Sequence, residues 1–177
     1  VSAHPLDNFR FVIDTFSNMS VAQLENCQEL ANRDFHVAGM VENVVIATSK
    51  SGSQFCKLQV EGYDGTYEFA FFGQNFDKFR NYYYKDNQLL ISGKVTQRYK
   101  GADFRPEVTS IISLQEAKER LVHELVIQLY TSMIDEKLVE ELDRLMEQNK
   151  GDKPLKFSIY EPKERVLVNM LSKKYKV

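Results

Sequence analysis

The sequence predicts a mainly β fold with several helices, of the α+β class, from three observations. Apolar and polar side chains alternate over five segments between residues 35 and 113, which is the period of half-buried strands. In "NFDKFRNYYY", between the third and fourth of these segments, the spacing of the apolar residues becomes helical. A second helical pattern, "DEKLVEELDRLMEQNKG", lies among further alternating segments nearer the C-terminal end.

The composition limits the classes of function. The chain has 177 residues, 43% of them hydrophobic, which suffices for a globular core, and a net charge of −2, so any basic patch must be local. Cys27 and Cys56 have no CxxC partner, which argues against a zinc site or a disulfide framework and fits the reducing cytoplasm. No apolar run approaches the roughly 18 residues of a membrane span, and no signal peptide is present, so no membrane partner is expected.

Three parts are expected along the chain. Residues 1–34 form a helical lead-in and linker, in which Leu6, Phe9, Ile13 and Phe16 share one helical stripe. Residues 35–113 form the five-stranded domain, and residues 114–177 form a β-α-β-β unit. The chain begins without methionine and stops at "SKKYKV", so we expect a fragment of a longer protein.

The five-stranded domain has the element order of an OB-fold barrel, with one helix between strands three and four. Closing five strands requires a bent first strand, and Gly39 is the expected bend. The barrel core is expected to take Cys56, Leu58 and Val60 from strand two and Tyr67, Phe69 and Phe71 from strand three. Phe76 and Phe79 of the helix are expected to cap it. Pro106 predicts an edge or a bulge in the fifth strand.

The C-terminal unit starts with a short helix at "QEAKERL" and a strand at "HELVIQLY". In the amphipathic helix that follows, Asp135 is the expected N-cap and Gly151 the expected end. "LKFSIY" and "RVLVNML" are two further expected strands.

The outward face of strands two and three is the candidate binding site. Exposed aromatic rings can stack on unpaired bases, for about 1–3 kcal/mol per base, and cations neutralise phosphates. OB-folds bind single strands on this face, between the loops that follow strands one and four. The candidate nucleic-acid-binding residues are Lys50, Phe55, Lys57, Gln59, Phe72, Arg98, Tyr99, Lys100 and Arg105.

The segment "HVAGMVENVVIATSKSGSQFCKLQVEGYDGTYEFAFFGQNFDKF" resembles the OB domain of the bacterial replicative DNA polymerase III alpha subunit, a C-family DNA polymerase. "SAHPLDNF" is similar to the family's S-G-H-P-L-D segment, with Ala3 in place of the usual glycine. "TSKSG" carries one inserted serine relative to the family hairpin, and "FFG" stands where the family usually has a proline. The stretch from "LQEAKERL" to "RVLVNML" resembles the start of the tau-interacting region.

The resemblance implies a fragment of a DNA-directed DNA polymerase, a nucleotidyltransferase of bacterial DNA replication. The palm carboxylates and their two Mg²⁺ ions would lie upstream, so no catalytic residue, metal site or cofactor is expected in this fragment. The implied partners are single-stranded template DNA, the clamp-loader tau subunit and, through the parent chain, the sliding clamp. The family hairpin also carries the lysine that matches Lys50.

Two alternatives remain open at this point. The chain could be purely a protein-interaction module, or it could contain the anticodon-binding OB domain of an aminoacyl-tRNA synthetase. The second alternative shares the barrel pattern but explains neither His4-Pro5-Leu6-Asp7 nor the C-terminal β-α-β-β unit.

Overall fold

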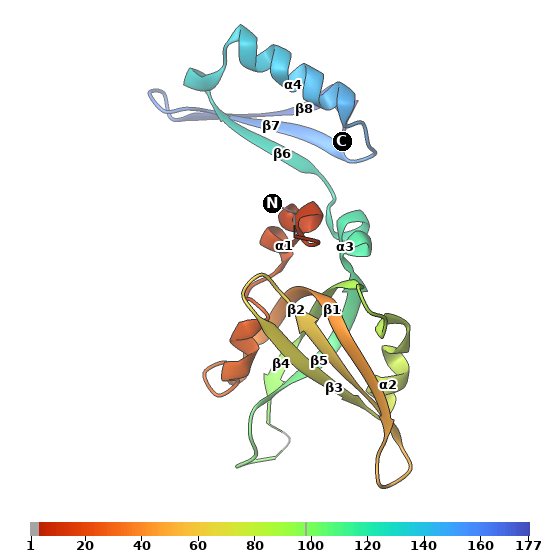
Figure 1. Cartoon of the computed structure of the whole chain (residues 1–177). Coiled ribbons are helices and arrows are strands. Elements are labelled where there is room, and N and C mark those ends of the chain that lie inside the picture. The colour runs from red at the N-terminus through yellow and green to blue at the C-terminus, as the bar shows by residue number, and fades with distance from the viewer. Residues whose placement is uncertain (1–3, 98) are drawn as a thin grey trace. The chain divides into compact units, whose positions relative to one another are not determined.

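The computed structural model describes residues 4–97 and 99–177 and divides the chain into two compact units, Val1–Glu119 and Arg120–Val177 (Figure 1). The first unit contains a five-stranded antiparallel sheet in the order β3-β2-β1-β4-β5. Its strands are β1 (Asp34–Thr48), β2 (Gln54–Glu61), β3 (Thr66–Phe72), β4 (Gln88–Thr96) and β5 (Arg105–Ser113). The sheet thus has the strand order of an OB-fold, and the α+β fold class is confirmed.

The first strand serves two partners, and Gly39 lies where they meet. Residues 34–40 of β1 pair with β4, and residues 40–48 pair with β2, with a register shift between Val41 and Asn43. A Cβ atom on Gly39 would lie 2.5 Å from Val60 Cγ1 and 2.7 Å from the carbonyl oxygen of Glu61. Only glycine therefore lets β2 approach this closely, whereas the irregularity of the first strand lies a few residues further on, between Val41 and Asn43.

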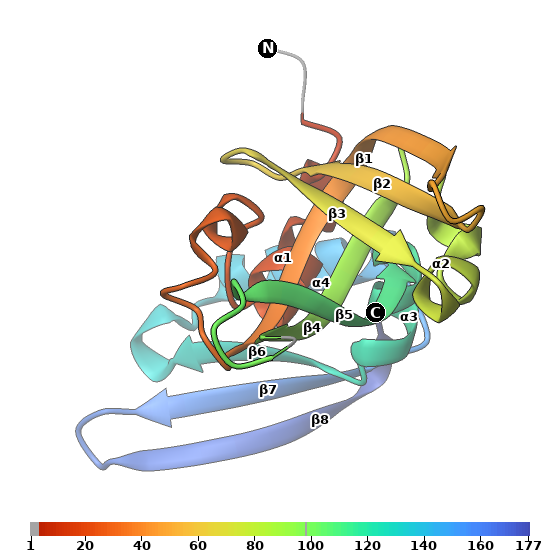
Figure 2. The same cartoon turned by 90° about the horizontal axis from the view of Figure 1, so that it is seen from below.

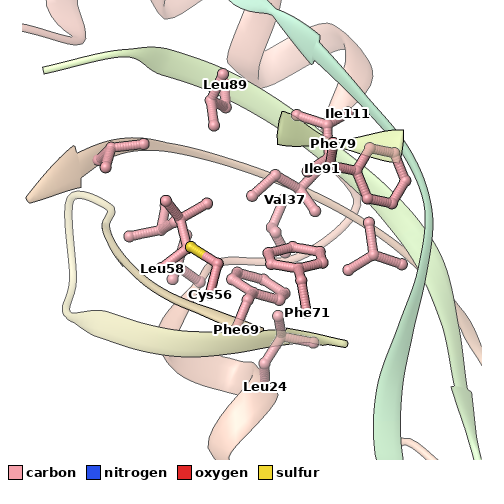
Figure 3. Packing of buried hydrophobic residues seen from close by; sticks show 14 of the residues in the cluster. Leu24, Val37, Cys56, Leu58, Phe69, Phe71, Phe79, Leu89, Ile91 and Ile111 are labelled. Carbon is pink, nitrogen blue, oxygen red and sulfur yellow. The ribbon is translucent and has the colours of Figure 1, made fainter. Parts of the chain in front are cut away.

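The core of the first unit lies on the inner side of this sheet (Figure 3). Cys56, Leu58, Val60, Phe69 and Phe71 are buried there, as the alternation predicts. Helix α2 (Gln74–Lys78) and the 3-10 turn η3 (Arg80–Tyr82) follow β3. They bring three further rings into the core, those of Phe76, Phe79 and Tyr83.

The barrel is open between β3 and β5, whereas the sequence predicts a closed one. Among the described residues, no pairing joins these two strands, which are the edges of the sheet. The N-terminal segment covers the edge at β3: Leu24 of η2 (Ala22–Asn26) is fully buried in the core. On the other edge, Pro106 has no N–H to donate to a neighbouring strand.

The segment predicted as a linker therefore contributes to the core. Val21 and Leu24 are both buried, and Val21 packs where a side chain on Gly62, in the β2–β3 turn, would meet it at 3.1 Å. Asn32 and Arg33 add backbone hydrogen bonds to Val95 of β4.

A second, smaller cluster joins the chain start to the end of the sheet. It contains Leu6 and Val12, which belong to the segment of η1 (Asp7–Phe9) and α1 (Arg10–Phe16). It also contains Leu114 and Ala117 of α3 (Leu114–Leu121). Because these side chains are buried within the first unit, the division between the units falls after residue 119, six residues beyond the boundary at 113 that the sequence suggests.

The second unit is a three-stranded sheet in the order β6-β7-β8, with α4 lying along one face (Figure 1). Its elements are β6 (Leu125–Tyr130), η4 (Thr131–Met133), α4 (Glu136–Gln148), β7 (Pro154–Glu161) and β8 (Val166–Lys176). Strand β6 runs parallel to β7, with α4 as the crossover, and β7 and β8 form an antiparallel hairpin. This is the predicted β-α-β-β order.

The start of α4 is as the sequence predicts, but its end is not. The Asp135 carboxylate accepts a hydrogen bond of 2.7 Å from the backbone N–H of Leu138. The helix stops at Gln148 with Asn149 as its C-cap. Gly151 lies against the backbone of Val177, where a side chain would collide, and its N–H donates a hydrogen bond to the carbonyl of Lys176, so this glycine allows a close contact with the end of β8 and does not end the helix.

Candidate nucleic-acid interface

The outer face of β1, β2 and β3 forms three cross-strand rows, which the register fixes. The first row is Ala47, Phe55 and Phe72, the second is Val45, Lys57 and Ala70, and the third is Asn43, Gln59 and Glu68. We call these nine residues the outer face. Figure 2 shows the three strands side by side. Side chains on one face of directly opposed residues lie within contact distance, so each row is a continuous surface.

Two aromatic rings dominate the first row. Phe55 and Phe72 are opposite each other in the β2–β3 register, and their ring centroids are 5.2 Å apart with an interplanar angle of 19°. The Phe72 side chain is 59% exposed, while Phe55 is partly covered. The stacked pair therefore presents an apolar, flat surface to solvent, as a base-stacking platform requires.

The second row contains a cation that is already paired. The Lys57 ammonium lies 2.7 Å from a carboxylate oxygen of Glu68, diagonally across β2 and β3, and both side chains are about half exposed. In the sequence, Lys57 is expected to meet phosphates. In the structure its ammonium is paired with the Glu68 carboxylate instead.

The third row ends in a shallow hollow lined by Glu25, Gln59, Thr66, Tyr67 and Glu68. Burial raises the pKa of the Tyr67 phenol to about 12, with nearby Cys27 adding to the effect, whereas the charge of Arg105 acts in the opposite direction. Among these neighbours, Glu25 and Glu68 make the hollow acidic.

Of the remaining described candidates, Lys50, Tyr99 and Lys100 lie in two loops, and Arg105 is the exposed first residue of β5. Lys50 is exposed in the β1–β2 turn, which closes through the Ser49 N–H to Ser53 carbonyl and Gly52 N–H to Ser49 carbonyl hydrogen bonds. Tyr99 is 70% exposed and Lys100 is exposed, both in the β4–β5 connection. Arg98 lies outside the described residues.

The structure thus brings Phe55, Lys57, Gln59 and Phe72 together on one surface, whereas the other described candidates lie in two loops and at the start of β5. Two features are not evident from the residue list: Phe55 stacks on Phe72, and Glu68 binds Lys57. Both follow from the β2–β3 register. That register could be derived from the four-residue "GYDG" turn between two alternating segments.

Other kinds of site have less support. Among residues 4–97 and 99–177, no group of three or more His, Cys, Asp or Glu side chains could hold a metal ion. Within the same described ranges, no helix has the length and apolarity to cross a membrane. Burial raises the pKa of the Cys56 thiol to about 11, so this cysteine is a core residue and not a nucleophile.

Two solved structures are similar to this chain at a low level. The mitochondrial single-stranded DNA binding protein Rim1 from S. cerevisiae has 16% identity and a TM-score of 0.34, covering 47% of this chain and 94% of that chain. The second OB-fold domain of replication protein A from Methanococcus maripaludis has 20% identity and a TM-score of 0.32, covering 54% and 94%. We draw no functional conclusion from similarities this low.

The sequence comparisons are more specific. The DNA polymerase III subunit alpha of Saccharopolyspora erythraea is 25% identical over 166 residues, which are 92% of this chain and 14% of the relative. The subunits of Haemophilus influenzae and Pseudomonas aeruginosa are 23% and 20% identical, over 96% and 88% of this chain and 15% and 13% of theirs. The chain therefore spans about a seventh of the length of these curated relatives.

Residues 125–177 match the family described as "DNA polymerase III alpha subunit, C-terminal domain". This range coincides with the second unit from β6 onward, whereas the curated relatives extend the similarity through the five-stranded sheet. The chain is thus similar over most of its length to bacterial DNA polymerase III alpha subunits, and its residues 125–177 match the family of that subunit's C-terminal domain.

Proposed function

We propose that the first unit binds single-stranded DNA on its outer face, as the template-binding module of a replicative polymerase. The observation that supports this most is the exposed, stacked pair of Phe55 and Phe72 on an OB-type sheet. Base stacking on such rings tolerates any sequence, because every base has a π face. A template-binding surface in a replicative enzyme needs that tolerance.

The cations expected to contact phosphates lie in two loops and at the start of β5. Lys50 and Lys100 are exposed in the loops after β1 and β4, and Arg105 begins β5. Each phosphate that they neutralise releases counterions, which lowers the affinity as salt rises. Because the net charge of the chain is −2, we expect weak binding that depends on these few positions.

Fluorescence anisotropy of a labelled oligo-dT, titrated with the protein at about 50 mM and about 200 mM salt, tests the proposal. We expect saturable binding that weakens at the higher salt, and further weakening in a Lys50→Ala, Lys100→Ala double variant. A failure to bind at the lower salt, or binding that the double variant leaves unchanged, argues against it.

We also propose that the second unit docks the clamp-loader tau subunit. An apolar stretch of β8 supports this: Val166, Leu167, Val168, Met170 and Leu171 are each between 45% and 60% exposed. Apolar patches of this kind on a folded domain commonly mark a protein interface. The parent protein would be a DNA-directed DNA polymerase that carries its palm carboxylates, its two Mg²⁺ ions and its contact to the sliding clamp.

Co-precipitation with purified tau tests the docking. A Leu167→Lys, Leu171→Lys variant should lose tau, whereas Val139→Lys should retain it, because Val139 is comparably exposed, at 54%, but lies on α4. Retention of tau after deletion of residues 120–177 would place the docking site elsewhere. Purely protein-binding behaviour of both units would favour the interaction-module alternative. The similarity to polymerase subunits over most of the chain favours the DNA-binding proposal over the anticodon-binding alternative.

A further inference from the structure

The ion pair between Lys57 and Glu68 lies at the centre of the outer face. The ammonium and the carboxylate are 2.7 Å apart, and their side chains are 46% and 51% exposed. On β2, Lys57 is flanked by Phe55 and Gln59 on the same face, and its opposite neighbours are Val45 and Ala70. Neither opposite neighbour has a charged side chain, so Glu68 is the group nearest to Lys57 that can determine where its ammonium lies.

Lys57 is also the sole cation on this surface. Among the described outer-face residues and their extension to Glu61 and Thr66, all other side chains are neutral or acidic. With Lys57 neutralised by Glu68, the surface presents no free positive charge to a phosphate, yet it keeps the stacked rings of Phe55 and Phe72.

We propose that Glu68 holds Lys57 away from the phosphates of bound single-stranded DNA, so that the outer face binds by stacking and its salt dependence comes from the loops. This inference rests on the proposed function and adds a residue that sets the balance between stacking and charge. Glu68 is a positioning residue: it acts on the nucleic acid through Lys57.

The physical basis is competition for one ammonium group. If a phosphate takes Lys57, the Glu68 carboxylate is left unpaired beside a second negative charge, so the exchange gains little. In Glu68→Gln the competitor is neutral, and Lys57 becomes available. One additional phosphate contact steepens the slope of log K against log salt by about 0.7 for a single strand.

Four proteins test this: the unsubstituted 177-residue chain, called the parent in these comparisons, Lys57→Gln, Glu68→Gln and the double variant. Each is titrated with labelled oligo-dT at several salt concentrations. Lys57→Gln should leave the salt slope of the parent unchanged. In the Glu68→Gln background, the same substitution should remove a slope of about 0.7, which is roughly a threefold change in affinity between 50 and 200 mM salt. Glu61→Gln is the matched control, because it removes a carboxylate from β2 that makes no ion pair with Lys57.

The outcomes separate this inference from the proposed function. Loss of the same slope on Lys57→Gln in both backgrounds would show that Glu68 does not withhold Lys57, although DNA binding itself would stand. If Lys57 contributes equally to the salt slope in a Glu61→Gln background, Glu68 acts only through general repulsion of the DNA by negative charge. That result would also overturn the inference. Absence of oligo-dT binding in the parent chain and in Glu68→Gln would overturn both the inference and the proposed function.

Discussion

The rings of Phe55 and Phe72 stack across β2 and β3, with centroids 5.2 Å apart, at outward positions of two strands whose inward residues form the core. Because successive side chains of a strand point to opposite faces and the neighbouring inward residues are buried, both rings must lie on the outer face. Moving either ring inward would require its strand to turn over. The pair is thus a fixed surface feature, in contrast to the side chains of the flanking loops.

Phe72→Ala should weaken binding of oligo-dT by about 1–3 kcal/mol, because it removes one stacking partner of the bases. Anisotropy titration measures the effect. Phe11→Ala is the control, since Phe11 is 55% exposed and Phe72 59%, yet Phe11 lies on α1. Equal losses from the two substitutions would mean that the outer face has no special role.

Leu24→Ala should lower the free energy of unfolding by about 2–5 kcal/mol, the usual cost of removing a fully buried leucine. Leu24 has no exposed surface and packs in the main core. Urea unfolding compares this variant with Gln28→Ala, whose side chain is exposed in the same N-terminal segment. If both variants unfold like the parent, the segment is a linker, as the sequence alone suggests.

Gly39→Ala should destabilise the first unit by about 1–3 kcal/mol through overpacking. The added Cβ would meet Val60 Cγ1 at 2.5 Å and the Glu61 carbonyl oxygen at 2.7 Å, and the backbone oxygen cannot move without loss of strand pairing. The midpoint of urea unfolding reports the change. An unchanged midpoint would show that β1 does not need its close approach to β2.

The Asp143 carboxylate of α4 should titrate below its ordinary range. Hydrogen bonds from Lys174, at 2.8 Å, and from the Tyr175 hydroxyl, at 2.7 Å, lower its pKa. A carboxyl whose pKa is depressed in the folded state contributes stability above its unfolded pKa of about 3.9, and this stability is lost as pH falls through the folded pKa. Carbon-13 NMR of the Asp143 carboxyl measures the midpoint. A value at or above the ordinary one would contradict these contacts, and Asp143→Asn should make the second unit less sensitive to acid.

Local patterns predict most of the strands and their faces. The third strand is expected at "TYEFAFF" and observed at Thr66–Phe72. The inward residues of β2 and β3 are buried as the alternation implies, except Tyr67, which is partly buried at the edge of the core. The alternation follows from the geometry of the strand backbone alone, so it can be predicted without knowledge of the tertiary contacts. The Asp135 cap of α4 is predictable for the same reason, since a cap depends on neighbours in sequence.

Features that depend on distant contacts could not be predicted. Val21 and Leu24 lie in a polar segment without clear periodicity, and their burial depends on the opening beside β3. The pairing of Lys57 with Glu68 is a partial exception: the two residues are eleven positions apart, but their proximity follows from the β2–β3 register that the four-residue "GYDG" turn indicates. The alternation of side chains therefore identifies the residues of the outer face, but alternation alone does not reveal that the one cation of this face is neutralised.

The measurement that tests the central claim most directly is amide NMR of the labelled chain during titration with unlabelled oligo-dT at low salt. The proposed interface predicts chemical-shift changes concentrated on residues 43–47, 55–59 and 68–72 and on the loops that hold Lys50 and Lys100. Spectra that do not change, or changes confined to α1, α3 or the second unit, would contradict single-strand binding on the outer face.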